Sequence, residues 1–132
     1  MKESFYIYYS KLKNLYTIPM IIPTQSMTIT NQAESDSIKL DFLHLKKAAL
    51  VLRAMNHKLR QQMIKMLDEN QRLTVTEIYV KLRLEQSVAS QHLAILRRAG
   101  IVVTQRDGKF IYYTVNYPRV SEVMKFVEDL VK

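Results

Sequence analysis

The sequence contains no cysteine, and only two glycines and three prolines occur among its 132 residues. Without cysteine, disulfide bonds, thiol redox switches and thiolate metal sites are excluded. Glycine and proline are the residues that most often interrupt regular structure, so their scarcity favours a mostly helical chain with few turns. The sequence also lacks any apolar run of about 18 residues, and it therefore predicts no transmembrane helix.

Acidic residues are scarce as well. The 12 Asp and Glu residues are outnumbered by 20 Lys and Arg, which gives a formal net charge of +8 and a pI of about 9.7. This balance favours a polyanionic partner, with nucleic acid ahead of an anionic membrane surface. Excess lysine that serves only solubility would give the same pI, so charge alone does not decide. At 48% hydrophobic residues the chain can build the core of one domain with an extension.

Residues 1–36 differ from the rest, because tyrosines, lysines and two prolines are mixed there without sustained periodicity. We expect an N-terminal extension, either disordered or preceding a true start at Met27. It contains at most a short amphipathic helix near Phe5–Tyr16, and it ends in a polar linker at Asn31–Ser37. Lysines and a proline break its apolar segment, so a secretory signal is not predicted. The domain proper is then 37–132.

Past the linker, apolar residues recur at helical spacing in two successive stretches. The first predicted helix runs from about Leu40 to Met55, and its apolar stripe is wide enough to bury more than one face, as at a subunit contact. Asn56 is the expected N-cap of the second helix, in which Arg60 is expected to point outward. Residues 74–77 (TVTE) match a capping box, which predicts the start of a third helix.

The stretch from Leu84 to Gly108 organises the rest of the chain. Its first half predicts a helix whose apolar face is formed by Ala89, Leu93 and Leu96. Small and polar residues occupy another face, as a helix that enters the DNA major groove requires, although an ordinary solvated face has the same composition. Gly100 is expected to end this helix with a positive φ. Together with the helix before it, this segment predicts a helix-turn-helix.

After Gly100 the apolar pattern repeats every second residue, which predicts two strands, Ile101–Gln105 and Phe110–Val115. The segment Arg106–Lys109 joins them and contains Asp-Gly, a strong hairpin signal. A two-stranded wing is therefore expected after the helix-turn-helix. Its basic tip can rest on phosphates or enter the minor groove, and the alternative interpretation is a soluble turn.

The last predicted helix starts at Tyr117–Pro118, with proline in its first turn. Its apolar face has to dock on its own domain or on a second copy. Together with the first helix it is the expected interface of a two-fold dimer, which would present two recognition helices to a pseudo-palindromic site. The interface residues we predict are Leu43, Leu52, Val120, Val123, Met124 and Val127.

The segment Ser87–Val102 (SVASQHLAILRRAGIV) resembles the recognition helix of the ArsR family of bacterial winged-helix repressors. Arg106, Gly108 and Tyr112–Tyr113 are similar to the wing of that family, and the resemblance extends from about Leu52 to Asn116. It implies a homodimer with helices from both ends of the chain at its interface. It also implies a repressor whose affinity for DNA falls when an inducer binds.

The chain departs from this family at both of the places where its members often bind metal. Thr74 and Thr76 stand where metal sensors often carry Cys-x-Cys, and the last helix contains carboxylates but no histidine. We therefore expect no metal and no cofactor, and the sequence identifies no inducer. His44 is expected to be packed near the interface, and His57 to lie at the surface or cap a helix.

These observations predict a mostly α fold with a small β-hairpin: a winged helix-turn-helix that dimerises through its N- and C-terminal helices. The protein is predicted to be a cytoplasmic, sequence-specific transcriptional regulator that binds double-stranded DNA as a homodimer. No membrane is expected among its partners. Its predicted DNA contacts are Gln86, Ser87, Ser90, Gln91, His92, Arg97, Arg98, Arg106 and Lys109.

Three other classes of function are alternatives to this prediction. A winged-helix interaction module without specific DNA binding is the main alternative, and membrane binding by the basic, tyrosine-rich N-terminus is another. An enzyme is not predicted, because the sequence shows no nucleophile–base spacing, glycine-rich phosphate loop or metal triad.

Overall fold

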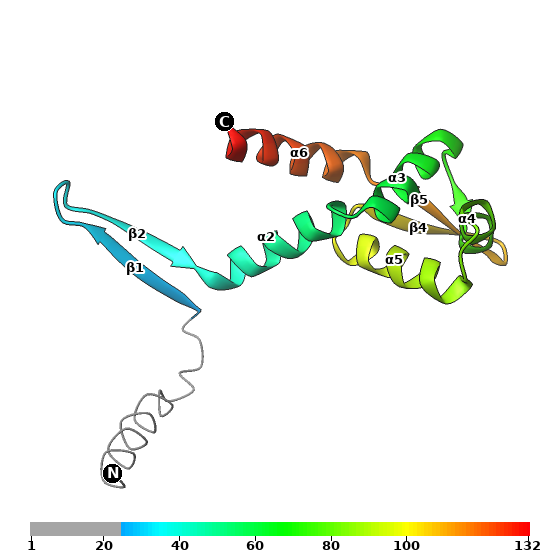
Figure 1. The fold of residues 1–132 in the computed structure, drawn as a ribbon, viewed down its shortest axis with the longest axis horizontal. Helices are drawn as coiled ribbons and strands as arrows, with labels where there is room; N and C mark the ends of the chain where they lie inside the picture. Colours follow the sequence, from blue (N-terminus) through cyan, green and yellow to red (C-terminus); the bar gives the residue numbers. More distant parts are fainter. Residues whose placement is uncertain (1–24) are drawn as a thin grey trace, which may run out of the picture. The chain divides into compact units, whose positions relative to one another are not determined.

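The structure, a computed structural model, describes residues 25–132 and divides the chain into two compact units, Met1–Lys46 and Lys47–Lys132. The elements carry the labels of Figure 1. The short helix expected near residues 5–16 lies outside the described residues. Across the part of the chain that is described, no helix has the length and apolar character needed to span a membrane.

The first unit contains an antiparallel hairpin that the sequence pattern did not predict. Strand β1 (Ser26–Asn31) pairs with β2 (Asp36–Asp41) along its whole length. The turn between them is held by Asn31, whose side-chain Oδ1 accepts a hydrogen bond from the backbone N–H of Ala33 at 3.2 Å. The predicted polar linker at Asn31–Ser37 is therefore wrong, and a domain boundary after residue 36 would fall inside β2.

Helix α2 (Phe42–Met55) follows β2 without a linker. Asp41 caps it, because its Oδ1 accepts from the backbone N–H of His44 at 3.0 Å and its Oδ2 lies 2.7 Å from the His44 ring Nδ1. The backbone hydrogen bond from His44, and then the ring, hold the pKa of Asp41 below its usual value. The helix begins two residues after the expected Leu40. His44 is an exposed partner of Asp41 rather than a packed residue.

The second unit contains the end of α2, four further helices and a small sheet. The helices are α3 (Lys58–Asn70), α4 (Val75–Leu82), α5 (Gln86–Arg98) and α6 (Tyr117–Val131). The N-cap of α3 is His57 rather than the expected Asn56, because the His57 Nδ1 accepts from the N–H of Leu59 at 3.2 Å. The capping box is confirmed: Thr74 Oγ1 accepts from the N–H of Glu77, and Glu77 Oε2 accepts from the N–H of Thr74.

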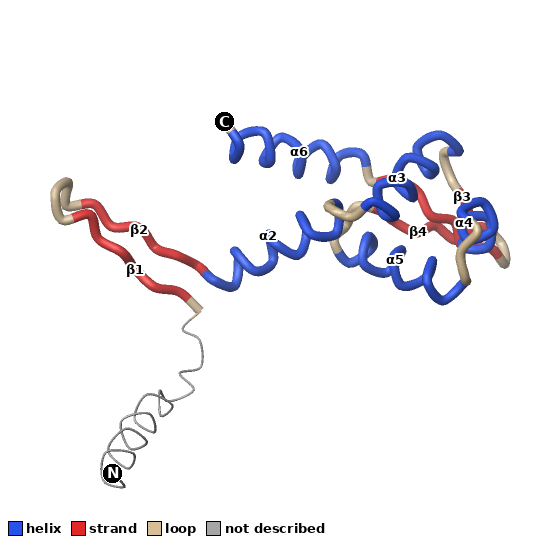
Figure 2. The backbone as a smooth tube through the Cα atoms, in the orientation of Figure 1, coloured by secondary structure: helices blue, strands red, loops and turns tan. Residues whose placement is uncertain are grey.

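The wing belongs to a three-stranded antiparallel sheet. Its strands are β3 (Leu73–Thr74), β4 (Val102–Asp107) and β5 (Phe110–Val115), in the order β3-β5-β4. The short β3 was not predicted. Because Asp107 pairs with Phe110, only Gly108 and Lys109 form the loop, and Arg106 lies in the strand rather than in the turn. Helix α3 contacts β5 and α5 contacts β4, so the sheet lies beside the helix-turn-helix (Figure 2).

One hydrophobic core holds these elements together. Its buried residues are Met63, Leu67, Leu73, Ile78, Ala89, Leu93, Leu96, Ile101, Val102, Val115 and Val123. Apart from Ile101, which lies between α5 and β4, they come from α3, β3, α4, α5, β4, β5 and α6, so every element of the second unit after α2 contributes at least one. The predicted core face of α5 is confirmed. The predicted fold, mostly helical with a small β wing, is confirmed as well.

Arg60 is buried, and the expectation that it points outward is wrong. Only 6% of its surface is exposed, and it is the one charged residue in the buried class among the described residues. Its Nε donates to the carbonyl of Ala54 at 2.6 Å and its Nη2 to the carbonyl of Arg53 at 2.9 Å. These carbonyls end α2 and have no partner within that helix. Arg60 therefore caps α2 from α3, where the negative end of the helix dipole offsets its charge.

Replacing Arg60 with methionine is expected to lower the free energy of unfolding by about 2–4 kcal/mol, because it leaves buried hydrogen-bond acceptors without a donor. Urea denaturation at fixed protein concentration measures the change. Lys58→Met, an exposed change on the same helix, is the control and should stay within about 0.5 kcal/mol of the parent. Equal stabilities of the two variants would show that the Arg60 contacts do not stabilise the fold.

Candidate nucleic-acid interface

The helix-turn-helix consists of α4, a three-residue turn and α5. Helix α4 is followed by its C-cap Arg83, whose φ of 54° and ψ of 46° place it in the left-handed region. The turn is completed by Leu84 and Glu85, and Gln86 is the first residue of α5. A tight turn of this kind fixes the angle between the two helices, so α5 is held by α4 as well as by the core.

Helix α5 divides into a buried side and an exposed side. The buried side carries Ala89, Leu93 and Leu96, none of which has measurable exposure. Six of the predicted contact residues are exposed, namely Gln86, Ser87, Ser90, Gln91, Arg97 and Arg98. The exposed side thus presents hydroxyl, amide and guanidinium groups and no carboxylate, while Glu85 stands just before the helix. Such groups can donate to and accept from base edges and can neutralise phosphates.

The end of α5 is set by Gly100, as predicted. Gly100 has a φ of 76°, and its N–H donates to the carbonyl of Arg97 at 3.0 Å. The N–H of Ile101 donates to the carbonyl of Leu96, also at 3.0 Å. This pair of bonds is a Schellman motif, which turns the chain from the helix into β4. A side chain at position 100 would be strained at this φ.

His92 does not lie with the other predicted DNA contacts. At about 100° per residue it sits roughly 160° around the helix from Ser90, and it is only partly exposed. Its Nδ1 lies 3.1 Å from Nη1 of Arg60, and its ring is 4.9 Å from the ring of His57. Because a guanidinium only donates, Nδ1 accepts and the proton of the neutral ring is assigned to Nε2. His92 therefore contacts Arg60 on the side of α5 that lies away from Ser90.

The wing carries the remaining predicted contacts. Lys109 is exposed in the two-residue loop, and its Nζ lies 5.3 Å from the centre of the Phe110 ring. Arg106 is exposed in β4, and its Nε donates to the carbonyl of Gly108 at 3.1 Å, which holds the side chain against the tip. Both cations are therefore anchored by the hairpin itself.

Arg72 is a cation of this region that the sequence pattern did not single out. It precedes β3, and its guanidinium lies 4.3 Å from the centre of the Tyr112 ring on β5. Its Nη1 also lies 3.2 Å from Asp107 Oδ2, so it offsets the one carboxylate of the wing hairpin. Only the pairing of β3 with β5 brings Arg72 to the wing, and no local signal in the sequence shows that pairing.

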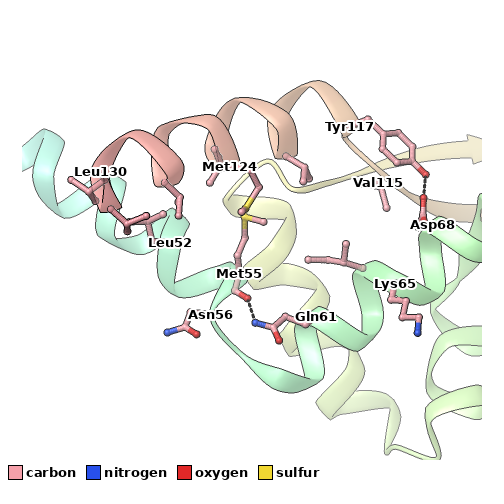
Figure 3. Close-up of a pocket in the computed structure, with 15 residues that line it drawn as sticks. Leu52, Met55, Asn56, Gln61, Lys65, Asp68, Val115, Tyr117, Met124 and Leu130 are labelled. Carbon is pink, nitrogen blue, oxygen red and sulfur yellow. Dashed lines mark hydrogen bonds between the residues drawn. The ribbon is translucent and has the colours of Figure 1, made fainter.

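A second surface, separate from α5, is an apolar groove of about 800 Å³ formed by α2, α3 and α6 (Figure 3). Five of the six predicted interface residues line it: Leu52, Val120, Val123, Met124 and Val127. Val123 is only 6% exposed and belongs mainly to the hydrophobic core, whereas Met124 is 42% exposed. The sixth, Leu43, is exposed but lies in the first unit and not in this groove.

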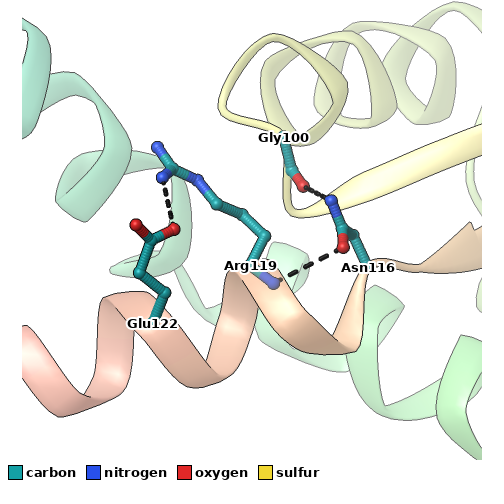
Figure 4. Close-up of polar contacts among 4 residues, drawn as sticks. All are labelled: Gly100, Asn116, Arg119 and Glu122. Atoms are coloured by element: carbon teal, nitrogen blue, oxygen red, sulfur yellow. Dashed lines mark hydrogen bonds and ion pairs between the residues drawn. The ribbon is translucent and has the colours of Figure 1, made fainter.

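Asn116 joins the end of α5 to the start of α6 (Figure 4). Its Nδ2 donates to the carbonyl of Gly100 at 2.9 Å, and its Oδ1 accepts from the N–H of Arg119 at 3.4 Å. Arg119 in turn pairs with Glu122 at 2.8 Å. The N-cap of α6 therefore bonds the backbone at the C-terminal end of α5, so the two helices are held at a fixed junction.

Metal ligands do not gather in this part of the chain. Within residues 25–132, no three His, Cys, Asp or Glu side chains lie close enough together to hold a metal ion. The chemistry of the surface is that of hydrogen bonding and of positive charge.

Known proteins share this arrangement. The family model described as bacterial regulatory protein, arsR family, matches residues 57–104. The chain is 38% identical over 84 residues to the transcriptional activator HlyU of Vibrio cholerae, which covers 64% of this chain and 77% of that protein. It is 33% identical over 92 residues to the transcriptional repressor PagR of Bacillus anthracis, and this match covers 70% of this chain and 92% of that protein.

Solved structures agree with these sequence matches. That of HlyU has a TM-score of 0.52 at 37% identity and covers 66% of this chain and 94% of its own. That of PagR has a TM-score of 0.53 at 34% identity, with 65% and 98% covered. NolR from Sinorhizobium fredii has a TM-score of 0.55 at 29% identity, with 79% and 93% covered.

The hydrogen bond to His92 predicts a pH dependence of stability. Burial, then the charges of His57 and Arg60, lower the pKa of His92 below its usual value. The unfolded chain then binds a proton more readily than the folded one, so stability is full above about pH 6.5 and falls as the pH drops toward the lowered folded value. His92→Asn keeps an acceptor for Arg60 and cannot titrate.

We expect the free energy of unfolding of the parent protein to fall as the pH drops below about 6.5, the usual histidine pKa, and that of His92→Asn to fall less. Denaturant unfolding at several pH values measures both. Parallel losses in the two proteins would show that the protonation state of His92 does not matter for the fold.

Proposed function

The chain belongs to the arsR family of bacterial regulatory proteins, and on this premise we propose that it is a homodimeric repressor that recognises a pseudo-palindromic operator. Membership of this family makes it a DNA-binding transcriptional regulator and not an enzyme. The observation that carries the proposal is the exposed side of α5, whose polar and cationic side chains are all free of the core.

Base recognition is assigned to the first half of α5. Gln86, Ser87, Ser90 and Gln91 lie exposed there, and small hydroxyl residues let the helix approach the base pairs closely. Gln91 is the one with an amide that can bond an adenine edge in two places. Large apolar or acidic groups on this side would favour a protein-interaction module, and the exposed residues include neither.

Phosphate contacts are assigned to Arg97 and Arg98 at the end of α5 and to Arg106 and Lys109 on the wing, with Arg72 as an additional candidate. His92 is left out, because its ring faces Arg60 rather than solvent on the exposed side. Contacts to phosphates position the protein without reading sequence, and they make affinity depend steeply on salt.

Dimerisation is assigned to the groove between α2 and α6. Its lining is largely apolar and open, and a second copy would remove that surface from water. A two-fold axis would then place two copies of α5 at a fixed spacing, as a palindromic site requires.

The proposal also states that the protein represses transcription. A dimer bound across a promoter excludes polymerase without needing any further surface, and one relative, PagR, is named as a repressor. HlyU is named as an activator, so a reporter-gene assay has to establish whether this protein represses or activates transcription. Since the proposed target is bacterial DNA, we place the protein in the cytoplasm.

Lys109→Ala is expected to weaken binding to specific and random DNA by similar factors, and to reduce the slope of log affinity against log salt by about 1, because one phosphate contact is lost. Gln91→Ala is its counterpart and should relax discrimination at one base-pair position by about 1–3 kcal/mol while leaving the salt slope unchanged. Titration of labelled duplexes at several salt concentrations separates the two effects.

If Lys109→Ala leaves the DNA affinity and the salt slope unchanged, the wing does not contact DNA. Equal losses on all base-pair variants in Gln91→Ala would show that Gln91 does not read a base.

Met124→Glu is expected to dissociate the dimer, because it puts a carboxylate into the apolar groove. Sedimentation equilibrium should show a dimer dissociation constant at least about a hundredfold higher, equivalent to some 2.7 kcal/mol. Lys125→Glu changes the neighbouring exposed residue, which does not line the groove, and should leave the dimer intact. A Met124→Glu protein that stays dimeric would place the interface elsewhere.

A further inference from the structure

The hairpin of the first unit has one apolar face and one polar face. Its register pairs Met27 with Leu40 and Ile29 with Ile38, and side chains of paired strands alternate between the two sides, so these four residues share a face. The opposite face is formed by Ser26, Thr28, Thr30, Ser37, Lys39 and Asp41. Such a separation of apolar from polar side chains is typical of antiparallel strands that pack one face against other protein.

The apolar face is open. Met27, Ile29 and Ile38 are 47%, 45% and 53% exposed. A two-stranded hairpin is at best marginally stable in water unless one face packs on something. In the described sheet β1 and β2 each have only one neighbour, so both are edge strands as well. Within residues 25–132 the face therefore lacks the cover that its composition calls for.

We propose that this apolar face docks on a second copy of the chain, so that the hairpin is an arm of the dimer. The proposal rests on the dimeric function proposed above and adds a second contact to it. The first argument is continuity with the proposed interface helix, because β2 ends at Asp41 and α2 begins at Phe42. The N–H of Phe42 also donates to the carbonyl of Gln25 at 2.8 Å, which ties both strands of the arm to that helix.

The second argument is charge. The four apolar residues carry none, and Lys39 and Asp41 point to the other face. The one charged residue on the apolar side of the strands is Asp36, which lies beside the turn, at the end of the hairpin away from α2. A two-fold axis presents the same patch on both copies, so the uncharged part of the face next to α2 can approach its partner without like-charge repulsion. The first turns of α2 continue the apolar character, since Leu43 and Leu45 are exposed there.

The test compares two neighbouring residues on opposite faces, each changed to threonine, which keeps a branched side chain suited to a strand. Ile38→Thr is expected to raise the dimer dissociation constant by about ten- to a hundredfold, because both copies lose apolar contact. Lys39→Thr is the matched control and should leave it within about twofold. Sedimentation equilibrium of the full chain gives both constants, and circular dichroism checks that the helices remain.

The outcomes separate this proposal from the dimer itself. If Ile38→Thr matches the parent while Met124→Glu dissociates, the hairpin is not part of the interface and the dimeric function stands. If the parent protein is monomeric at every concentration, the dimer and the arm are both wrong.

A second measurement covers the case in which Ile38→Thr merely unfolds the hairpin. The natural sequence has no cysteine, so Ile38→Cys and Lys39→Cys each carry a single thiol. The proposal predicts that the thiol at position 38 reacts slowly with a thiol reagent above the dimer dissociation constant and quickly below it, whereas that at 39 reacts quickly at both. Protection of position 38 that does not depend on concentration would show that the same chain covers the face, and this would overturn the proposal.

Discussion

The buried guanidinium of Arg60 joins three helices, and the position of the proposed DNA-reading helix depends on it. It lies on α3, caps the carbonyls of Arg53 and Ala54 at the end of α2, and donates to His92 on α5. A buried charge is unfavourable unless its donors are satisfied, and here each of its three nitrogens has an acceptor. Because α5 is held at its back by this contact and by the core, its opposite side is left for a ligand.

The C-terminal end of α5 is joined to the start of α6. Helix α5 ends in a Schellman motif at Gly100, and the carbonyl of Gly100 is bonded by Asn116, the N-cap of α6. The proposed reading helix and the proposed dimer helix therefore share one rigid junction. In the proposed dimer, a change in how the two copies meet at α6 would reach α5 through this junction.

Local signals were enough for much of the fold. Gly100, the capping box at Thr74 and the Asp-Gly pair each act through backbone geometry within a few residues, so the sequence indicates them directly. The polar side of α5 could be predicted for the same reason, since helical spacing alone places it opposite Ala89 and Leu93. These are the parts of the candidate site that needed no tertiary information.

Non-local contacts account for the failures. The outward prediction for Arg60 failed because its acceptors lie on another helix. The contact between His92 and Arg60 joins residues that are 32 positions apart, so the sequence pattern of α5 alone does not show it. Arg72 reaches the wing only through the two-residue β3, too short to give a pattern. The first hairpin was missed because its four-residue turn contains no glycine or proline, although Met27, Ile29, Ile38 and Leu40 alternate as strand residues do.

The most direct measurement is the affinity of the purified protein for the DNA upstream of its own gene, compared with scrambled DNA of equal length and composition, over a range of salt concentrations. A specific dimeric regulator predicts a preference of about a thousandfold or more for its operator, together with a steep fall of affinity as salt increases. If that DNA shows no preference, selection from a random duplex pool extends the same measurement to any operator. Equal, weak and salt-sensitive binding to every duplex, with no sequence enriched from the pool, would contradict the account.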